Sequence, residues 1–403
     1  MRVLLISDTE AKGGAAIAAA RMACALGKAG HEVGMVVNDP QEGLPAGPWQ
    51  RYVVRAEESI PWNRVPDASL EAEALGGLER TLNEFSPDAV SVHNIHGGAR
   101  VGWSVDLVRL CAGRVPTVWT LHDTWSFTGR CAYLDGCSLF RDGCDERCPT
   151  TGEYPFLRPG GVSAEFSRKA GVLRVSPGLA AAAPSRWMAE LAACGLWRGR
   201  EVRLLPNCLD TAAYAPGDRA EARRALGLAV EGRVLLLCAA NFGDPRKGVG
   251  MAREALKRLG APLTLLVMGR ADDLPDLPGV TVKRLGFVAD QARQIMAYRA
   301  ADAMLHPALQ DNLPNTVLES LACGTPVAGF DVGGMGDLVL DGLTGRLAAS
   351  VTPEGLAEAA IDCLERSETL GAAGRAHVLE QFSEAWMAAR WTALIQTLQG
   401  GAA

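Results

Sequence analysis

Polar residues between positions 311 and 319 stand in the order that a phosphate and sugar site requires. Asp311 precedes an expected helix start at Pro314, and Asn315 and Thr316 follow in the first turn. Proline is favoured at the first helical turn, so the N–H groups of Asn315 and Thr316 should lie at a helix N-terminus, which attracts phosphate. Glu319 follows three and four residues later and shares their helix face. Its carboxylate could accept both hydroxyls of a ribose whose phosphates lie at the helix end.

A second polar loop follows an expected strand at Val234–Ala240. It reads Asn-Phe-Gly-Asp-Pro-Arg-Lys-Gly and contains Arg246 and Lys247. In a doubly wound sheet, ligands bind at the carboxyl ends of strands, so the two cations would stand where a diphosphate binds. They could offset the charge that develops on a departing nucleoside diphosphate. The alternative is a solvated Arg–Lys pair that opens a helix.

A two-glycine turn, Gly13 and Gly14, separates the first expected strand from an alanine-rich helix. Such a turn lets the backbone approach a ligand closely. It lacks the G-x-G-x-x-G pattern of dinucleotide-binding sites, so the case for nicotinamide binding is weak. The alternative is a tight strand–helix turn without a ligand.

Histidines follow two further expected strands. His122 and Asp123 come directly after one, and His93, Asn94 and His96 come after another. We expect His122 to project at the ligand-binding edge, although a lone histidine more often caps a strand end. The other three residues suit contacts with an acceptor or hydrogen bonds within their loop.

Four cysteines are clustered with the spacing C-x5-C-x6-C-x3-C, at Cys131, Cys137, Cys144 and Cys148. Four soft ligands in one loop could hold a structural zinc ion. Reduced thiols or a disulfide pair are the alternatives, because the spacing is not that of a familiar zinc motif.

The elements that position these residues alternate between short apolar strands and helices, in two series. This pattern predicts doubly wound parallel sheets. A Pro-Asn-Cys-Leu-Asp segment at 206–210 interrupts it and reads as a linker. We therefore expect an N-terminal domain at 1–205, a nucleotide-sugar-binding domain at 206–385, and a final helix at 386–403. An apolar stripe on that helix could return it to the first domain, or could mark an ordinary amphipathic core helix.

Length and composition agree with two α/β domains. The chain has 403 residues, 48% of them hydrophobic, and a net charge of −6, which argues against nucleic acid as a partner. Its longest apolar runs are strand-sized and fall short of the roughly 20 residues that span a bilayer. The N-terminal sequence lacks the long apolar stretch of a signal peptide, so we expect a cytoplasmic protein.

The chain resembles the retaining family 4 glycosyltransferases. The resemblance rests on two acidic residues separated by seven others, Asp311 and Glu319, ahead of a Cys-Gly-Thr-Pro helix stop. It also rests on Lys247 before a glycine. Asp311 is a departure, because the family usually has Glu there, and Asn241 stands where the family usually has Arg. The resemblance implies the GT-B architecture, which is two facing Rossmann-like domains with a deep cleft between them.

The resemblance also implies roles for individual residues. Glu319 would bind the ribose, Asp311 would orient the donor sugar, and His122 would contact the transferred sugar. The leaving diphosphate would be stabilised by Lys247 and by a donor-binding set that is shared by both domains: Gly13, Gly14, Arg246, Asn315 and Thr316. His122, Asp311 and Lys247 are thus the expected catalytic residues, and no catalytic metal or cofactor is required.

The expected substrates are a nucleoside-diphosphate sugar and a glycan or lipid-linked acceptor of an exopolysaccharide or cell-surface pathway. A lipid-linked acceptor would bring the protein to the inner face of the membrane as a peripheral partner. Two alternatives stay open. One is a nucleotide-sugar epimerase of the same architecture, and the other is a non-catalytic subunit with a decayed site.

Overall fold

The computed structural model describes residues 1–40, 47–56, 68–150, 155, 157, 159–241, 243–260, 262–270 and 279–400. The chain divides into two compact units. Unit 1 comprises Met1–Cys208 and Glu384–Ala403, and unit 2 comprises Leu209–Ser383. Among the described helices, none is long and apolar enough to cross a membrane.

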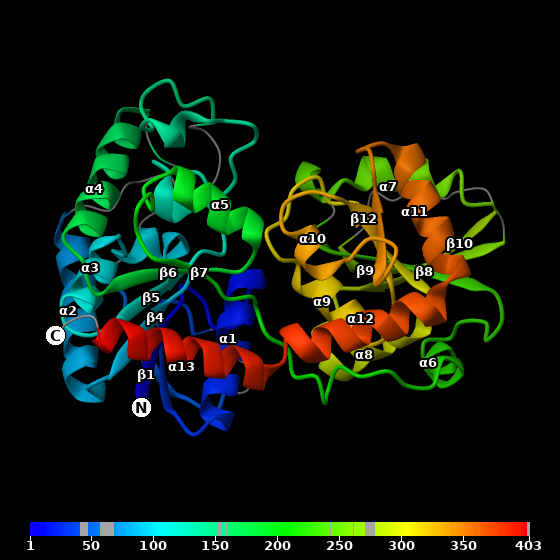
Figure 1. Cartoon of the computed structure of the whole chain (residues 1–403), viewed down its shortest axis with the longest axis horizontal. Coiled ribbons are helices and arrows are strands. Elements are labelled where there is room, and N and C mark those ends of the chain that lie inside the picture. Colours follow the sequence, from blue (N-terminus) through cyan, green and yellow to red (C-terminus); the bar gives the residue numbers. More distant parts are fainter. Residues whose placement is uncertain are drawn as a thin grey trace. The chain divides into compact units, whose positions relative to one another are not determined.

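Unit 1 contains a sheet of seven parallel strands, counted over its described residues, in the order β3-β2-β1-β4-β5-β6-β7. Figure 1 labels β1 and β4 to β7 of this sheet. The strands are β1 (Arg2–Ile6), β2 (Glu32–Val37), β3 (Gln50–Val53), β4 (Ala89–Val92), β5 (Thr117–Thr120), β6 (Leu179–Ala183) and β7 (Val202–Leu204). The helices are α1 (Gly14–Lys28), α2 (Ala68–Phe85), α3 (Asp106–Ala112), α4 (Val162–Arg174), α5 (Arg186–Cys194) and α13 (Glu384–Gly400).

Strand β1 shows why these apolar runs become buried strands. Leu4 and Ile6 pack into the core on one face of the sheet, whereas Val3 and Leu5 pack into the core on the other. Successive side chains of a strand point to opposite faces, so a strand that is covered on both faces reads as a continuous apolar run. Helices α2 to α5 contribute to the first core, and α1 and α13 to the second.

The last helix, α13, packs against α1 within unit 1 (Figure 1). Met387, Trp391 and Leu394 are buried in the core that α1 lines, and Leu398 packs against it. These four residues recur at helical spacing, so one apolar stripe attaches the helix to the sheet face.

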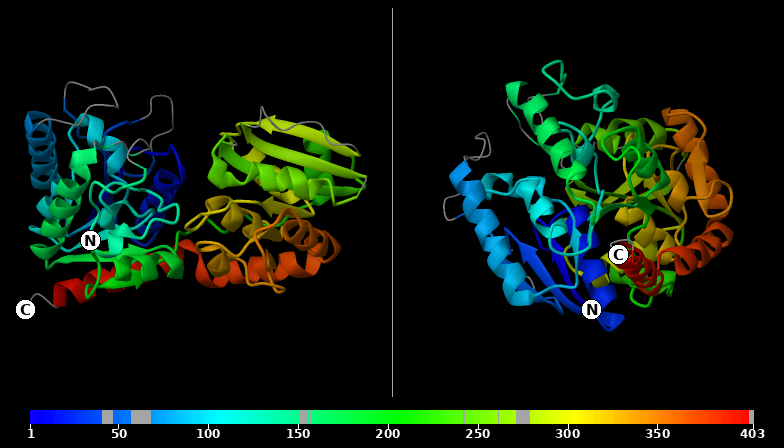
Figure 2. Two further views of the ribbon diagram at one scale, coloured as in Figure 1. Left: turned by 90° about the horizontal axis from the view of Figure 1, so that it is seen from above. Right: turned by 60° about the vertical axis from the view of Figure 1, so that its left-hand side comes forward.

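Unit 2 repeats the arrangement with six parallel strands, counted over its described residues, in the order β10-β9-β8-β11-β12-β13. Figure 2 shows the first of these strands side by side, in green to yellow. The strands are β8 (Arg233–Asn241), β9 (Leu263–Arg270), β10 (Val280–Gly286), β11 (Ala303–His306), β12 (Val327–Phe330) and β13 (Gly345–Ala348). The helices are α6 (Arg219–Ala225), α7 (Val249–Leu256), α8 (Gln291–Ala300), α9 (Asn315–Ala322), α10 (Met335–Leu338), α11 (Pro353–Glu365) and α12 (Ser367–Gln381).

Two strands fall outside the runs that the sequence predicts. β3 reads Gln-Arg-Tyr-Val and β13 reads Gly-Arg-Leu-Ala, and each lies at one edge of its sheet. Edge strands are short and tolerate charged side chains, so they lack the apolar run that marks a central strand. The sequence between 41 and 66 predicts no regular element. The structure describes β3 there, whereas 41–46 and 57–66 lie outside the described residues.

Candidate active site

Both sheets have a topological switch point, where neighbouring strands lead to connections on opposite faces. In unit 2 it lies between β8 and β11, and in unit 1 between β1 and β4. Ligands of open α/β sheets bind at the carboxyl ends of the strands at such a point. The loops at 243–248 and 307–314 follow β8 and β11, so they border the switch point of unit 2.

Glycine brings the two loops of unit 2 into contact. Gly248 has a φ of +64°, and a Cβ atom there would lie 1.9 Å from the carbonyl oxygen of Pro307. The backbone N–H of Leu309 also donates to the carbonyl oxygen of Arg246 at 2.7 Å. The short 3-10 turn Pro245–Lys247 is capped by Asp244, which accepts from the N–H of Arg246 at 3.0 Å.

This close approach pairs the two charged residues that the sequence predicts to handle the donor. The Lys247 ammonium donates to Asp311 Oδ2 at 2.7 Å. Burial by itself would raise the pKa of Asp311, but Lys247 and His306 lower it below its usual value. Asp311 is therefore ionised at neutral pH, and a phosphate that binds Lys247 competes with this carboxylate.

The backbone of Asp311 is held by the loop that follows β12. Its carbonyl oxygen accepts from the N–H of Gly334 at 3.1 Å. Gly333 has a φ of +58°, and a Cβ atom there would lie 1.8 Å from the same oxygen. Only glycine fits this contact, so three loops, following β8, β11 and β12, together set the position of the Lys247–Asp311 pair.

Glu319 lies on α9 and is 5% exposed. Its Oε2 accepts from the hydroxyl of Tyr298 on α8 at 2.6 Å. A carboxylate has about four acceptor positions on its two oxygens, so this bond leaves it able to accept from a ligand as well. Tyr298 was not predicted from the sequence, because nothing local marks a partner that is 21 residues away.

The other predicted residues of unit 2 lie around this centre. Asn315 and Thr316 form the first turn of α9, and Pro314 is its N-cap. The helix therefore begins at Asn315, one residue after Pro314. Arg246 Nη2 donates to Asp244 Oδ2 at 2.5 Å, so its charge is partly matched within its own turn. Asn241 is the last residue of β8, and its side chain lies outside the described part of the chain.

The charges of Glu319 and Lys247 both shift the pKa of Cys238, a buried thiol near the end of β8. Burial and then the charge of Glu319 raise the pKa of Cys238 to about 12, while Lys247 lowers it. Both charges therefore lie within electrostatic reach of Cys238. The structure thus brings Lys247, Asp311 and Glu319 to one edge of the unit 2 sheet.

In unit 1, Gly13 and Gly14 follow β1 at the start of α1: Gly13 precedes the helix and Gly14 is its first residue. Gly13 is the N-cap of α1 with a φ of +92°, and no atom within 4 Å would meet a Cβ there. The turn therefore needs glycine for its backbone conformation rather than for lack of space.

His122 is paired with His93 at the ends of neighbouring strands β5 and β4. Nδ1 of His93 lies 2.8 Å from Nε2 of His122, and the ring planes are 22° apart. Burial lowers the pKa of His122 to about 4 and that of His93 well below its usual value. Both rings are neutral at pH 7, so one nitrogen of the pair donates and the other accepts.

His96 and Asp123 form a second buried pair beside the first. His96 Nε2 lies 2.8 Å from Asp123 Oδ2, which also accepts from Asn94 Nδ2 at 3.2 Å. Burial lowers the pKa of His96, but Asp123 and Asp8 together raise it above its usual value. Asp8 was not predicted as a site residue, although its place directly after β1 was visible in the sequence.

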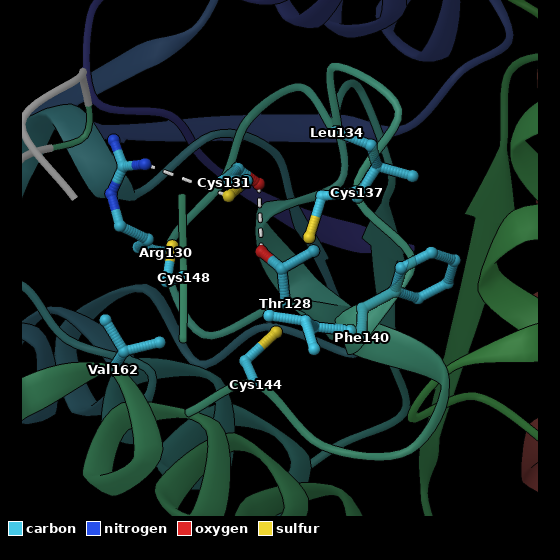
Figure 3. A pocket seen from close by; sticks show the side chains of 10 residues that line it. Thr128, Arg130, Cys131, Leu134, Cys137, Phe140, Cys144, Cys148 and Val162 are labelled. Atoms are coloured by element: carbon cyan, nitrogen blue, oxygen red, sulfur yellow. Dashed lines mark hydrogen bonds between the residues drawn. The ribbon is translucent and has the colours of Figure 1, made fainter. Parts of the chain in front are cut away.

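The four clustered cysteines line one small hollow (Figure 3). The other lining residues are Thr128, Arg130, Leu134, Leu139, Phe140 and Val162. All eleven cysteines of the chain are free thiols in the structure.

The expectation of a structural zinc ion in this loop is wrong. Across the described ranges, no group of three or more His, Cys, Asp or Glu residues could hold a metal ion. Arg130 and Thr150 approach Cys131 Sγ at 3.8 and 3.5 Å, and Thr150 lies 3.7 Å from Cys148 Sγ. Burial also raises the pKa of Cys131, and that of Cys144 to about 11.

Comparison with protein families decides which enzymes this chain is related to. Residues 12–213 match the family described as Glycosyltransferase Family 4, and residues 233–366 match that described as Glycosyl transferases group 1. The chain belongs to glycosyltransferase family 4. Both predicted site regions fall inside the matched ranges.

Curated relatives match over part of their length. WcaC of Escherichia coli strain K12, named as a colanic acid biosynthesis glycosyl transferase, is 30% identical over 216 residues, 53% of this chain and 51% of WcaC. D-inositol 3-phosphate glycosyltransferase of Geodermatophilus obscurus is 33% identical over 206 residues, 44% of this chain and 43% of that enzyme. The chain thus spans about half the length of the curated relatives it matches.

Solved structures share the fold over nearly the whole chain. Sucrose-phosphate synthase from Thermosynechococcus elongatus has a TM-score of 0.73 at 20% identity and covers 99% of both chains. Anabaena HepE in complex with UDP-glucose has a TM-score of 0.67 at 16% identity, with 99% of this chain and 100% of HepE covered. At these identities the likeness shows the fold, which is the GT-B architecture that the family 4 resemblance predicted.

Proposed function

We propose that this family 4 enzyme is a retaining glycosyltransferase that takes its sugar from a nucleoside-diphosphate donor. The observation that carries the proposal is the Lys247–Asp311 pair at the switch point of unit 2, at 2.7 Å. A cation for phosphate and a carboxylate for sugar hydroxyls stand side by side there. Glu319 lies on the adjoining helix, three and four residues after the turn whose N–H groups favour phosphate.

Each residue then has a distinct role. The carboxylate of Glu319 accepts the ribose hydroxyls, and Asp311 accepts hydroxyls of the donor sugar. Lys247, with Arg246 and the N–H groups of Asn315 and Thr316, offsets the charge of the departing diphosphate. In unit 1, we assign Gly13 and Gly14 to the donor and the neutral ring of His122 to the transferred sugar.

The transfer needs no group beyond the substrates and these side chains. The bond between the sugar's anomeric carbon and the diphosphate oxygen breaks, and the acceptor oxygen forms the new bond on the same face. The acceptor's proton passes to the departing phosphate oxygen, so atoms and charges balance. The protein contributes position and a fixed positive charge near the leaving oxygens.

The acceptor we propose is a growing glycan or a lipid-linked glycan of an exopolysaccharide or other cell-surface polymer. WcaC, which is similar to half of this chain, is named for colanic acid biosynthesis, and this supports a polysaccharide pathway. HepE structures with UDP and UDP-glucose support a uridine donor as the first to test. A lipid-linked acceptor would place the enzyme at the cytoplasmic face of a membrane.

Thermal stabilisation by a panel of UDP-, GDP- and ADP-sugars tests the donor. A ligand at 100 times its dissociation constant raises stability by about 2.7 kcal/mol. The stabilising donor should then label a lipid-linked or soluble glycan acceptor, with the anomeric configuration retained in the product by NMR. Lys247→Met should greatly reduce the stabilisation, whereas Lys257→Met, which alters an exposed lysine paired with Glu254, should not.

Two results would refute the proposal. One is that no nucleotide sugar stabilises the protein. The other is that Lys247→Met and Lys257→Met respond to the donor in the same way. Release of free nucleoside diphosphate with no glycosylated product would instead favour a different reaction on this site.

A further inference from the structure

His306, the last residue of β11, is buried beside the candidate site without a hydrogen bond. It is 4% exposed, and within the described residues neither of its ring nitrogens has a hydrogen-bond partner. Buried polar groups in folded proteins nearly always have such a partner, so an imidazole that lacks one requires an explanation.

The nearest charged oxygen belongs to Asp311. His306 Nε2 lies 3.8 Å from Asp311 Oδ2, which is too far for a hydrogen bond. The same oxygen accepts from Lys247 at 2.7 Å. The carboxylate thus has Lys247 as its side-chain donor, the N–H of Asn312 on Oδ1 at 3.1 Å, and in His306 a second potential side-chain donor about 0.6 Å beyond hydrogen-bond range.

A neutral imidazole can serve as that donor without taking up a proton. Burial lowers the pKa of His306 to about 4, so the ring carries a single N–H at neutral pH. With that hydrogen on Nε2, a small shift of either side chain would give a hydrogen bond to Asp311. A protonated ring beside Lys247 would instead be repelled.

We propose that His306 is a positioning residue, which donates a hydrogen bond to Asp311 when Lys247 turns from Asp311 to the donor's phosphates. The inference rests on the proposed function for its ligand, because an anion must draw Lys247 away. Without His306, that exchange would leave a partly buried carboxylate with no side-chain donor. With it, Asp311 stays ionised and oriented toward the donor sugar while Lys247 serves the diphosphate.

The exchange can be tested without any ligand, in the full-length protein. Lys247→Met removes the competing ammonium, so His306 should pair with Asp311 permanently. In protein labelled with [15N]histidine, the His306 Nε2–H resonance should become protected from solvent exchange and move downfield. The chain has six histidines, and His306→Gln identifies the resonance by removing it.

Asp311→Asn in the Lys247→Met background should abolish the downfield resonance. If the resonance in Lys247→Met matches that of the wild type, His306 is only a packing residue and the proposal is wrong. Saturating UDP, used as the probe, should produce the same downfield resonance in the wild type. If UDP fails to bind, the proposed donor is at fault, whereas the Lys247→Met result still decides the role of His306.

Binding measurements add a readout that a structural role would not change. His306→Leu should weaken UDP binding roughly tenfold with Lys247 present, a typical coupling for groups that share a partner. It should have no further effect on UDP affinity in the Lys247→Met background, because Asp311 then lacks both side-chain donors with and without UDP, so its partners do not change on binding. His306→Gln retains an N–H donor and should restore most of the affinity.

His377→Gln is the matched control, because His377 lies on α12 and its Nε2 is 3.1 Å from the carbonyl oxygen of Asp337. It should leave UDP binding unchanged. An equal loss from His306→Leu in both backgrounds would contradict the exchange.

Discussion

Replacing Glu319 separates its structural role from its role in binding, because one of its oxygens already has a partner in the core. Tyr298 is fully buried and donates to Glu319 Oε2 at 2.6 Å. Glu319→Ala removes the acceptor and leaves a buried hydroxyl unsatisfied, which costs about 1–3 kcal/mol of the free energy of unfolding. Glu319→Gln keeps an oxygen acceptor for Tyr298 and should leave stability within about 1 kcal/mol of the wild type.

The binding effect follows from the same carboxylate. Two ribose hydroxyls bound to a charged acceptor contribute about 1.5–3 kcal/mol each, against about 0.5–1.5 for a neutral acceptor. Glu319→Gln should therefore lose about 2 kcal/mol, which is roughly a 30-fold weaker affinity for a nucleoside diphosphate. Glu319→Ala should lose more than about a hundredfold, because both hydrogen bonds disappear.

Calorimetric titration with UDP and urea unfolding measure the two effects in parallel. Tyr298→Phe should remove the stability difference between the Ala and Gln variants, since no hydroxyl then needs an acceptor. Glu358→Ala, an exposed glutamate on α11, is the control and should change neither quantity. The assignment fails if Glu319→Gln binds UDP as tightly as the wild type does. The structural argument fails if Glu319→Ala unfolds at the wild-type urea concentration.

Two further predictions concern the buried lysine Lys169 and the backbone at Gly333. The pKa of Lys169 is lowered to about 8 by burial from an ordinary 10.5, so at this side chain the unfolded chain holds more protons between those values, and the contribution of Lys169 to the free energy of unfolding should rise by about 3 kcal/mol from pH 8 to 10.5. Urea unfolding should show this rise as a growing difference between the wild type and Lys169→Met; parallel curves would contradict it. Gly333→Ala should displace Asp311 and reduce donor binding and stability, because its Cβ would lie 1.8 Å from a carbonyl oxygen. Gly342→Ala, also at positive φ but with its nearest contact at 3.7 Å, should cost only the roughly 1–2 kcal/mol of left-handed strain; equal effects would refute the steric argument.

Much of the fold could be read from the sequence because buried parallel strands have a local signature. β1, β8 and β12 are apolar runs with both faces covered, and the helices between them end near glycine or proline. Two of the four edge strands, β3 and β13, were missed because a strand at a sheet edge does not require such a run. Family membership was equally visible, since the acidic pair at 311 and 319 lies within one loop and one helix.

What the sequence could not decide was which side chains meet. Lys247 and Asp311 are 64 residues apart, and their contact depends on β8 and β11 being neighbours in the sheet and on a glycine that lets the loops touch. His93 and His122 likewise meet only because β4 and β5 are adjacent.

In the cysteine loop, the sequence predicted a shared site that the folded residues do not form. Its spacing allowed a zinc site, but spacing does not determine whether four sulfurs converge or what lies between them. In the folded loop, Arg130 and Thr150 lie beside Cys131, and burial favours the protonated thiols. The sequence alone determined the periodic elements and the residue types at their ends, because both are local properties of the chain. Tertiary structure decided the partners and charge states of those residues, because these depend on strand order, loop contact and exclusion of water.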